Sequence, residues 1–170
     1  MLERDMTGEE VFWRYASACV GRMALFGHIT DDRLQRIHEY VKSGKPISHH
    51  LLNSCFPLAY WDSRKYARTN GLAQWDRDTQ ISFWRYEHRR KSEKCRAHRG
   101  RVKAVIRVEG IEFSTAIVMP DGPDEHDTNT YKAANIHRLS LEEGDTVYVH
   151  HFAIAEGVRN GYRLKAPLLI

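Results

Sequence analysis

The chain has 170 residues, of which 42% are hydrophobic and 28% are charged, so it can bury a core and is not disordered as a whole. It contains no apolar run long enough for a transmembrane helix, and its first residues lack the pattern of a secretory signal. Its three cysteines, Cys19, Cys55 and Cys95, are too few and too far apart for a disulfide framework. We therefore expect a protein of the reducing cytoplasm that does not enter the membrane.

The charge is unevenly distributed along the chain. The formal net charge is +4, yet the segment from Arg85 to Lys103 holds nine basic and two acidic residues and so carries +7. The rest of the chain therefore carries −3. We call residues 85–103 the basic segment.

The N-terminal part of the chain has the signals of successive helices. Thr7 and Glu10 form a capping box, and apolar residues from Phe12 to Met23 then recur at spacings of three and four. A second helix is predicted after Thr30-Asp31-Asp32 and ends at Gly44, and a third starts at Ser48, breaks at Pro57 and resumes over residues 58–68. Residues 72–92 fit either a strand or a helix; we favour a helix that begins at Asp76 or Asp78.

In the last 70 residues the apolar residues recur at every second position instead of every third or fourth. Residues 102–108 and 111–117 alternate on either side of Glu109-Gly110, which predicts a β-hairpin. Further strands are predicted over residues 147–153 and 162–169, with a turn at 156–161 between them.

These elements predict an α+β protein in which a helical N-terminal half packs on a small C-terminal β-barrel or curled antiparallel sheet. The predicted boundaries are residues 1–92 for the helical region, 93–100 for a basic connector and 101–170 for the β region, together forming one compact unit.

The basic segment is the strongest indication of function. Lysine and arginine hold polyanions, and nearby aromatic rings stack on unpaired bases. We therefore predict a nucleic-acid-binding protein that favours RNA or a single strand and acts as a non-catalytic subunit or regulator of a nucleic-acid machine. The predicted contact residues are Arg85, Arg89, Arg90, Lys91, Lys94, Arg96, Arg99, Arg101, Lys103, Trp84 and Tyr86.

Two alternatives to this interpretation of the basic segment stay open. The basic segment also fits an acidic protein partner or a solvated face without a ligand. Trp84, at helical spacing from Ile81 and His88, is expected in the core rather than on a base.

The chain shows no pattern that selects a catalytic or cofactor site. Cys95 and His98 have the spacing of half a zinc site, but no second pair completes it, so no metal is expected. The acidic residues from Asp121 to Asp127 lie among Pro and Gly and are interpreted as a surface turn. Glycine-rich phosphate loops, nucleophile elbows and zinc-hydrolase motifs are absent from the sequence, so we expect no cofactor and no catalysis.

One segment resembles a known family. Residues 144–154, Gly-Asp-Thr-Val-Tyr-Val-His-His-Phe-Ala-Ile, are similar to the G-D-x-V-x-V-H-x-x-F-A-I strand of the HypC/HupF proteins. Those proteins are small barrels that act as chaperones in the assembly of the metal centre of nickel–iron hydrogenases. The resemblance implies a small barrel and, as an alternative function, docking on an acidic protein partner without nucleic acid. The family's functional cysteine follows the initiator methionine, whereas this chain has Leu2.

Overall fold

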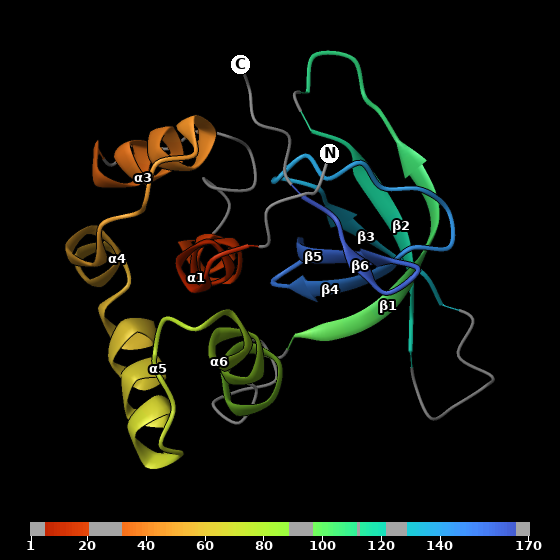
Figure 1. Ribbon diagram of the computed structural model, residues 1–170. Coiled ribbons are helices and arrows are strands. Elements are labelled where there is room, and N and C mark those ends of the chain that lie inside the picture. Colours follow the sequence, from red (N-terminus) through yellow and green to blue (C-terminus); the bar gives the residue numbers. More distant parts are fainter. Residues whose placement is uncertain (1–5, 21–31, 89–96, 112, 122–128, 166–170) are drawn as a thin grey trace.

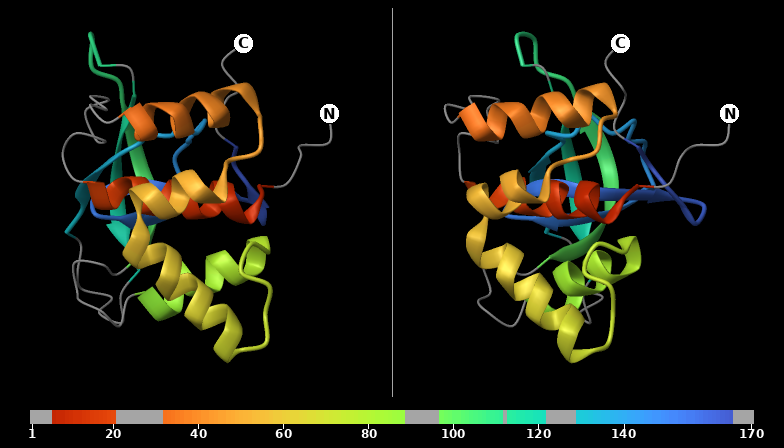
Figure 2. Two further views of the ribbon diagram at one scale, coloured as in Figure 1. Left: turned by 90° about the vertical axis from the view of Figure 1, so that its left-hand side faces the viewer. Right: turned by 60° about the vertical axis from the view of Figure 1, so that its left-hand side comes forward.

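Helices and strands occupy separate layers in the computed structural model, which describes residues 6–20, 32–88, 97–111, 113–121 and 129–165 (Figure 1). The side views show that the helices cover one face of the sheet, with α3 on one side of α1 and α5 and α6 on the other (Figure 2). The predicted α+β organisation, with helices first and an antiparallel sheet after them, is confirmed. The helical elements are α1 (Gly8–Ala16), the 3-10 turn η1 (Ser17–Val20), α3 (Asp32–Ser43), α4 (His49–Cys55), α5 (Pro57–Thr69), α6 (Arg77–Ser82) and the π-helical turn η2 (Phe83–Glu87).

Helix α1 lies between the other helices and the sheet (Figure 1). Its predicted cap is confirmed, because the backbone N–H of Glu10 donates to the Thr7 hydroxyl at 3.2 Å. The sequence predicts that only one face of this helix is buried, and this is wrong, because every residue from Val11 to Ala16 is buried. The helix is covered from both sides and ends at Ala16, so the predicted continuation toward Met23 gives way to η1, beyond which residues 21–31 lie outside the described part.

The remaining helices begin and end near the residues that the sequence predicts. Helix α3 ends before Gly44, which has a positive φ of 67°, and Pro57 occupies the first turn of α5 after the break from α4. Asp76 precedes α6 as its N-cap residue, which confirms the helical interpretation of this region. The helix then widens into η2.

The sheet has six strands in the order β3-β2-β1-β4-β5-β6, and its neighbours in this order are antiparallel. A parallel pairing of Ala134 with Ala153 also joins β3 to β5, so the sheet curls back on itself. Its concave side encloses an apolar cluster that includes Val102, Val118 and Val147. The strands are β1 (His98–Ile106), β2 (Thr115–Pro120), β3 (Tyr131–Ala134), β4 (Thr146–His150), β5 (Ala153–Arg159) and β6 (Tyr162–Arg163).

The hairpin predicted around Gly110 is confirmed, with Val102 opposite Val118 and Ile106 opposite Thr115. Strand β1 begins at His98, three residues before the predicted start of the β region at 101. The described residues contain no helix that is long and apolar enough to cross a membrane.

The predicted strand over residues 147–153 is wrong in its second half. Strand β4 ends at His150, and His151 and Phe152 form a tight turn with φ values of 49° and 61° before β5 begins. The predicted turn at 156–161 shrinks to Asn160-Gly161, because β5 continues to Arg159. The alternating residues around position 150 fit one long strand as well as two strands joined by a two-residue turn, so the sequence pattern does not distinguish the two structures.

Gly100 is the position at which the sheet tolerates no side chain. A Cβ there would lie 2.5 Å from Val118 Cγ1 and 2.8 Å from the Met119 carbonyl oxygen. We expect Gly100→Ala to lower the free energy of unfolding by about 1–3 kcal/mol, because the opposing backbone must shift to make room. Urea denaturation measures this loss, and an unchanged midpoint would contradict the assigned register.

Candidate functional site

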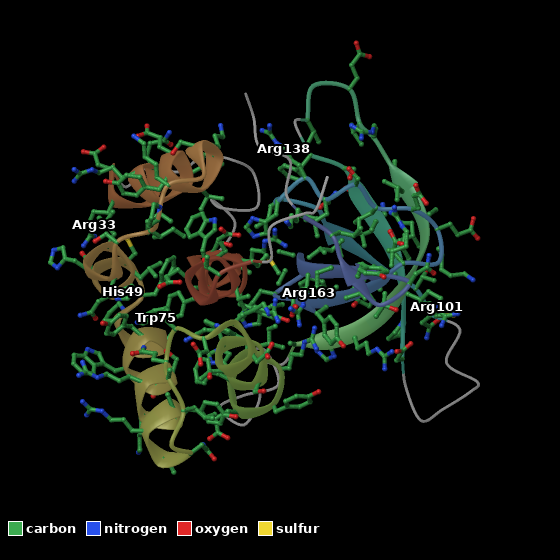
Figure 3. All side chains as sticks on the ribbon, in the orientation of Figure 1. Arg33, His49, Trp75, Arg101, Arg138 and Arg163 are labelled. Carbon is green, nitrogen blue, oxygen red and sulfur yellow. The ribbon has the colours of Figure 1, made fainter. Side chains whose placement is uncertain are left out.

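A buried carboxylate joins the two layers of the protein. Glu156 of β5 is 0% exposed and accepts hydrogen bonds from the Tyr15 hydroxyl of α1 and from Arg85 of η2. Arg85 binds it with two nitrogens, Nε to Oε2 at 3.1 Å and an Nη to Oε1 at 3.0 Å. Arg163 of β6 adds a contact at 3.6 Å and lies between the helices and the sheet (Figure 3).

A β-bulge turns Glu156 toward the helices. Tyr148 pairs with Glu156 and Val149 with Ile154, so Ala155 is an extra residue in β5. Strict alternation would place Glu156 on the same side as Ile154, inside the apolar cluster of the sheet. With the bulge, Ala155 packs in the helical core and Glu156 beside it meets Arg85.

The environment of this carboxylate changes the acidity of its partners. Burial, reinforced by the Glu156 charge, raises the pKa of Tyr15 well above its ordinary value, so the phenol keeps its proton and donates it in the hydrogen bond. Burial alone would lower the pKa of Arg85, but the Glu156 charge together with the contributions of Tyr15 and Tyr148 outweighs burial, and the pKa is raised. The guanidinium also lies over the Tyr148 ring, 3.5 Å from its centroid.

Aromatic and histidine side chains surround the Tyr15 end of this cluster. Trp84 stacks on Tyr15 with ring centroids 5.5 Å apart, and His150 lies 5.5 Å from Trp84. His150 Nδ1 donates to the Tyr15 carbonyl oxygen at 2.9 Å. Burial lowers the pKa of His150 to about 3, so the ring is neutral in the folded protein at neutral pH. The cluster is closed by packing and serves to hold the layers together.

The exposed part of the basic segment lies on β1. Arg99, Arg101 and Lys103 are all exposed, and Arg101 lies on the side of β1 turned away from the helices (Figure 3). Arg99 is opposite Tyr148 and Arg101 is opposite Thr146, which places these cations on the outer face of the sheet. We call Arg99, Arg101 and Lys103 the basic strand surface.

A second β-bulge lies in β1, at Lys103, the last residue of the basic strand surface. Val102 pairs with Val118 and Ala104 with Ile117, so Lys103 is an extra residue in β1. Lys103 faces outward like Arg101, two residues before it, and the bulge turns Ala104 outward as well, so both are exposed. Arg99 lies 3.3 Å from the Asp121 carboxylate, an exposed ion pair that contributes little to stability.

The predicted contact residues separate into three groups. Trp84 lies in the core with 0% exposure, as expected from its spacing, so it offers no face to a base, and Arg85 is held by Glu156 with 14% of its side chain exposed. Tyr86 is 57% exposed, and Arg99, Arg101 and Lys103 are exposed on β1. The predicted contacts that lie outside the described residues are Arg89, Arg90, Lys91, Lys94 and Arg96.

The weak metal candidate is only partly described. Cys95 lies outside the described residues, while His98 begins β1 and is exposed. Among the residues that the structure describes, no three His, Cys, Asp or Glu side chains gather in a way that could hold a metal ion. Most of the predicted acidic turn, residues 122–128, also lies outside the description.

Sequence reasoning missed Glu156 and Tyr15. The available signal was a glutamate inside an otherwise apolar strand, Ala153-Ile154-Ala155-Glu156-Gly157, since an unpartnered charge is rarely placed there. Its partners could not be inferred, because Tyr15 is 141 positions away along the chain.

Comparison with known proteins leaves the chain without an assigned relative. No family model, no curated protein and no solved structure matches it. The resemblance of residues 144–154 to the HypC/HupF strand stays a prediction, on a segment that forms β4, a turn and the start of β5.

We expect Glu156→Gln to lower the free energy of unfolding by about 3 kcal/mol, because it leaves the partly buried Arg85 charge without its counterion. The double variant Glu156→Gln with Arg85→Met should recover part of this loss. Glu142→Gln is the control, since the Glu142 side chain is 70% exposed and its ion pair with Arg159, at 3.5 Å, lies at the surface. Urea denaturation compares the three variants. Equal stability of Glu156→Gln and Glu142→Gln would contradict a structural role for Glu156.

Stability should also fall in mild acid. Burial holds the pKa of His150 at about 3 in the folded protein against an ordinary value of 6.5, so the unfolded chain binds more protons between these values. The contribution of His150 is therefore fully present above pH 6.5 and declines by up to about 1.4 kcal/mol per pH unit below it. His150→Gln should flatten the pH dependence of urea denaturation between pH 7.5 and 5, and an unchanged slope would refute this account.

Proposed function

We propose that this protein binds nucleic acid, preferring RNA or an unpaired strand, through the basic strand surface of β1. The observation that carries the proposal is the alignment of Arg99, Arg101 and Lys103 on one exposed strand. Alternate residues of a strand are about 6.6 Å apart, so the cations form a row that suits the successive phosphates of one strand.

The positive charge of this surface comes from the exposed cations of β1. Arg85 covers Tyr148, which is opposite Arg99, but the Arg85 charge is paired with Glu156 and little exposed. Tyr86 of η2 is 57% exposed, so a base could stack on its ring. Arginine predominates in this set, and its planar guanidinium binds phosphate with two nitrogens.

The preference for an unpaired strand follows from the position of the three cations of the basic strand surface. They lie on a strand, and sheets commonly present single strands with their bases splayed on the surface. Backbone contacts of this kind give weak sequence selectivity. The protein then acts as a non-catalytic subunit or regulator of a nucleic-acid machine.

The test is fluorescence anisotropy with a labelled 20-nucleotide oligouridylate and a 20-base-pair DNA duplex over a range of salt concentrations. If four to six phosphates are contacted, the slope of log affinity against log salt should be about −3 to −4 for the single strand. Arg101→Gln with Lys103→Gln should reduce the magnitude of that slope by about 1.4, because two contacts are removed.

Lys65→Gln with Arg68→Gln is the matched control, since it removes two exposed cations from α5, away from β1. Equal losses in both double variants, or a flat salt dependence of the wild type, would refute the assignment of the surface. Retention of a cellular protein partner after nuclease treatment, with no oligonucleotide binding, would favour the alternative of docking on an acidic protein.

A further inference from the structure

The two tight hairpin turns of the sheet have the same backbone form but different residues. At the β5–β6 turn, Asn160 and Gly161 have φ values of 51° and 81°. At the β4–β5 turn, His151 and Phe152 have φ values of 49° and 61°. Asn and Gly are the residues that this left-handed geometry favours, whereas a bulky residue such as Phe152 is strained there.

Nothing in the fold requires an aromatic side chain at this strained position. The Phe152 carbonyl oxygen accepts a hydrogen bond from the Ala134 N–H at 2.8 Å, a contact that any residue would make. The side chain is 68% exposed, and its ring meets that of Tyr131 at a centroid distance of 6.4 Å. The protein thus holds a large apolar ring in solvent on a turn where glycine would be less strained.

The register places this turn at the N-terminal end of the basic strand surface. His98 pairs with Val149 and Arg99 with Tyr148, so His151 follows two residues beyond the level of His98. That corresponds to about 7 Å along the strand direction. A nucleic-acid strand whose phosphates contact β1 can therefore extend to the turn.

We propose that Phe152 stacks on an unpaired base of the strand held by the basic strand surface. This inference rests on the proposed function and makes it more specific, because stacking on an exposed ring is open to unpaired bases and closed to those inside a duplex. It assigns to Phe152 the stacking role that the sequence suggested for Trp84, which lies in the core. Strained residues of this kind are characteristic of ligand contacts.

Phe152→Gly tests the proposal, because it should affect stability and binding in opposite directions. Relief of the positive-φ strain should leave the melting temperature unchanged or raise it by about 2–4 °C. Affinity for the 20-nucleotide oligouridylate should fall about 5- to 150-fold, the usual effect of removing one stacking ring. Affinity for the 20-base-pair duplex should change less than twofold.

Two further variants separate stacking from other roles of the side chain. Phe152→Trp should keep or strengthen oligouridylate binding, while Phe152→Leu, which is apolar but lacks a ring, should weaken it as glycine does. Tyr162→Ala is the matched control, since Tyr162 is an aromatic residue that is 78% exposed at the other hairpin. It should leave binding unchanged.

The outcomes distinguish this inference from the proposed function. Salt-dependent binding of oligouridylate that Phe152→Gly leaves unchanged would overturn the stacking role alone. Undiminished binding by Phe152→Leu, or an equal loss in Tyr162→Ala, would do the same. No binding by the wild-type protein at low salt would overturn the proposed function and the stacking role together.

Discussion

The buried carboxylate of Glu156 is the constraint on which the packing of the two layers depends. It belongs to β5, while its hydrogen-bond partners come from α1 and η2. Leaving such a carboxylate in the interior without partners would cost several kcal/mol, so the layers are stable only in an arrangement that brings Tyr15 and Arg85 to it. Apolar contacts supply most of the attraction between the layers, but they do not specify how the layers are oriented. The ion pair between Glu156 and Arg85 specifies this orientation.

The β-bulge of β5 decides where the Glu156 carboxylate lies. The extra residue Ala155 keeps Glu156 out of the apolar interior of the sheet and turns it toward the helices. The bulge of β1 does not change the direction of a charge, because Lys103 follows Arg101 by two residues and faces outward by alternation alone. Only Ala104 is turned outward there. One bulge therefore makes the buried ion pair possible, whereas the other changes only the position of an apolar residue.

The basic segment thus contains residues with different roles. Arg85 holds the fold together through Glu156, whereas Arg99, Arg101 and Lys103 remain on the surface. Tyr86 of this segment is exposed to solvent, whereas Trp84, immediately before the segment, lies in the core. Composition could identify the segment as a candidate interface, but the division between structural and exposed members depends on the elements that pack against it.

The sequence by itself determined the elements whose signals are local. The Thr7 cap, the helix end at Gly44, the break at Pro57 and the hairpin at Gly110 each depend on neighbours a few residues away, and all were predictable. The end of β4 at His150 and the pairing of Glu156 with Tyr15 were decided only by the tertiary structure. The physical reason is that a bulge or a buried ion pair gains its stability from residues distant in the chain, and no local pattern specifies which of them will meet.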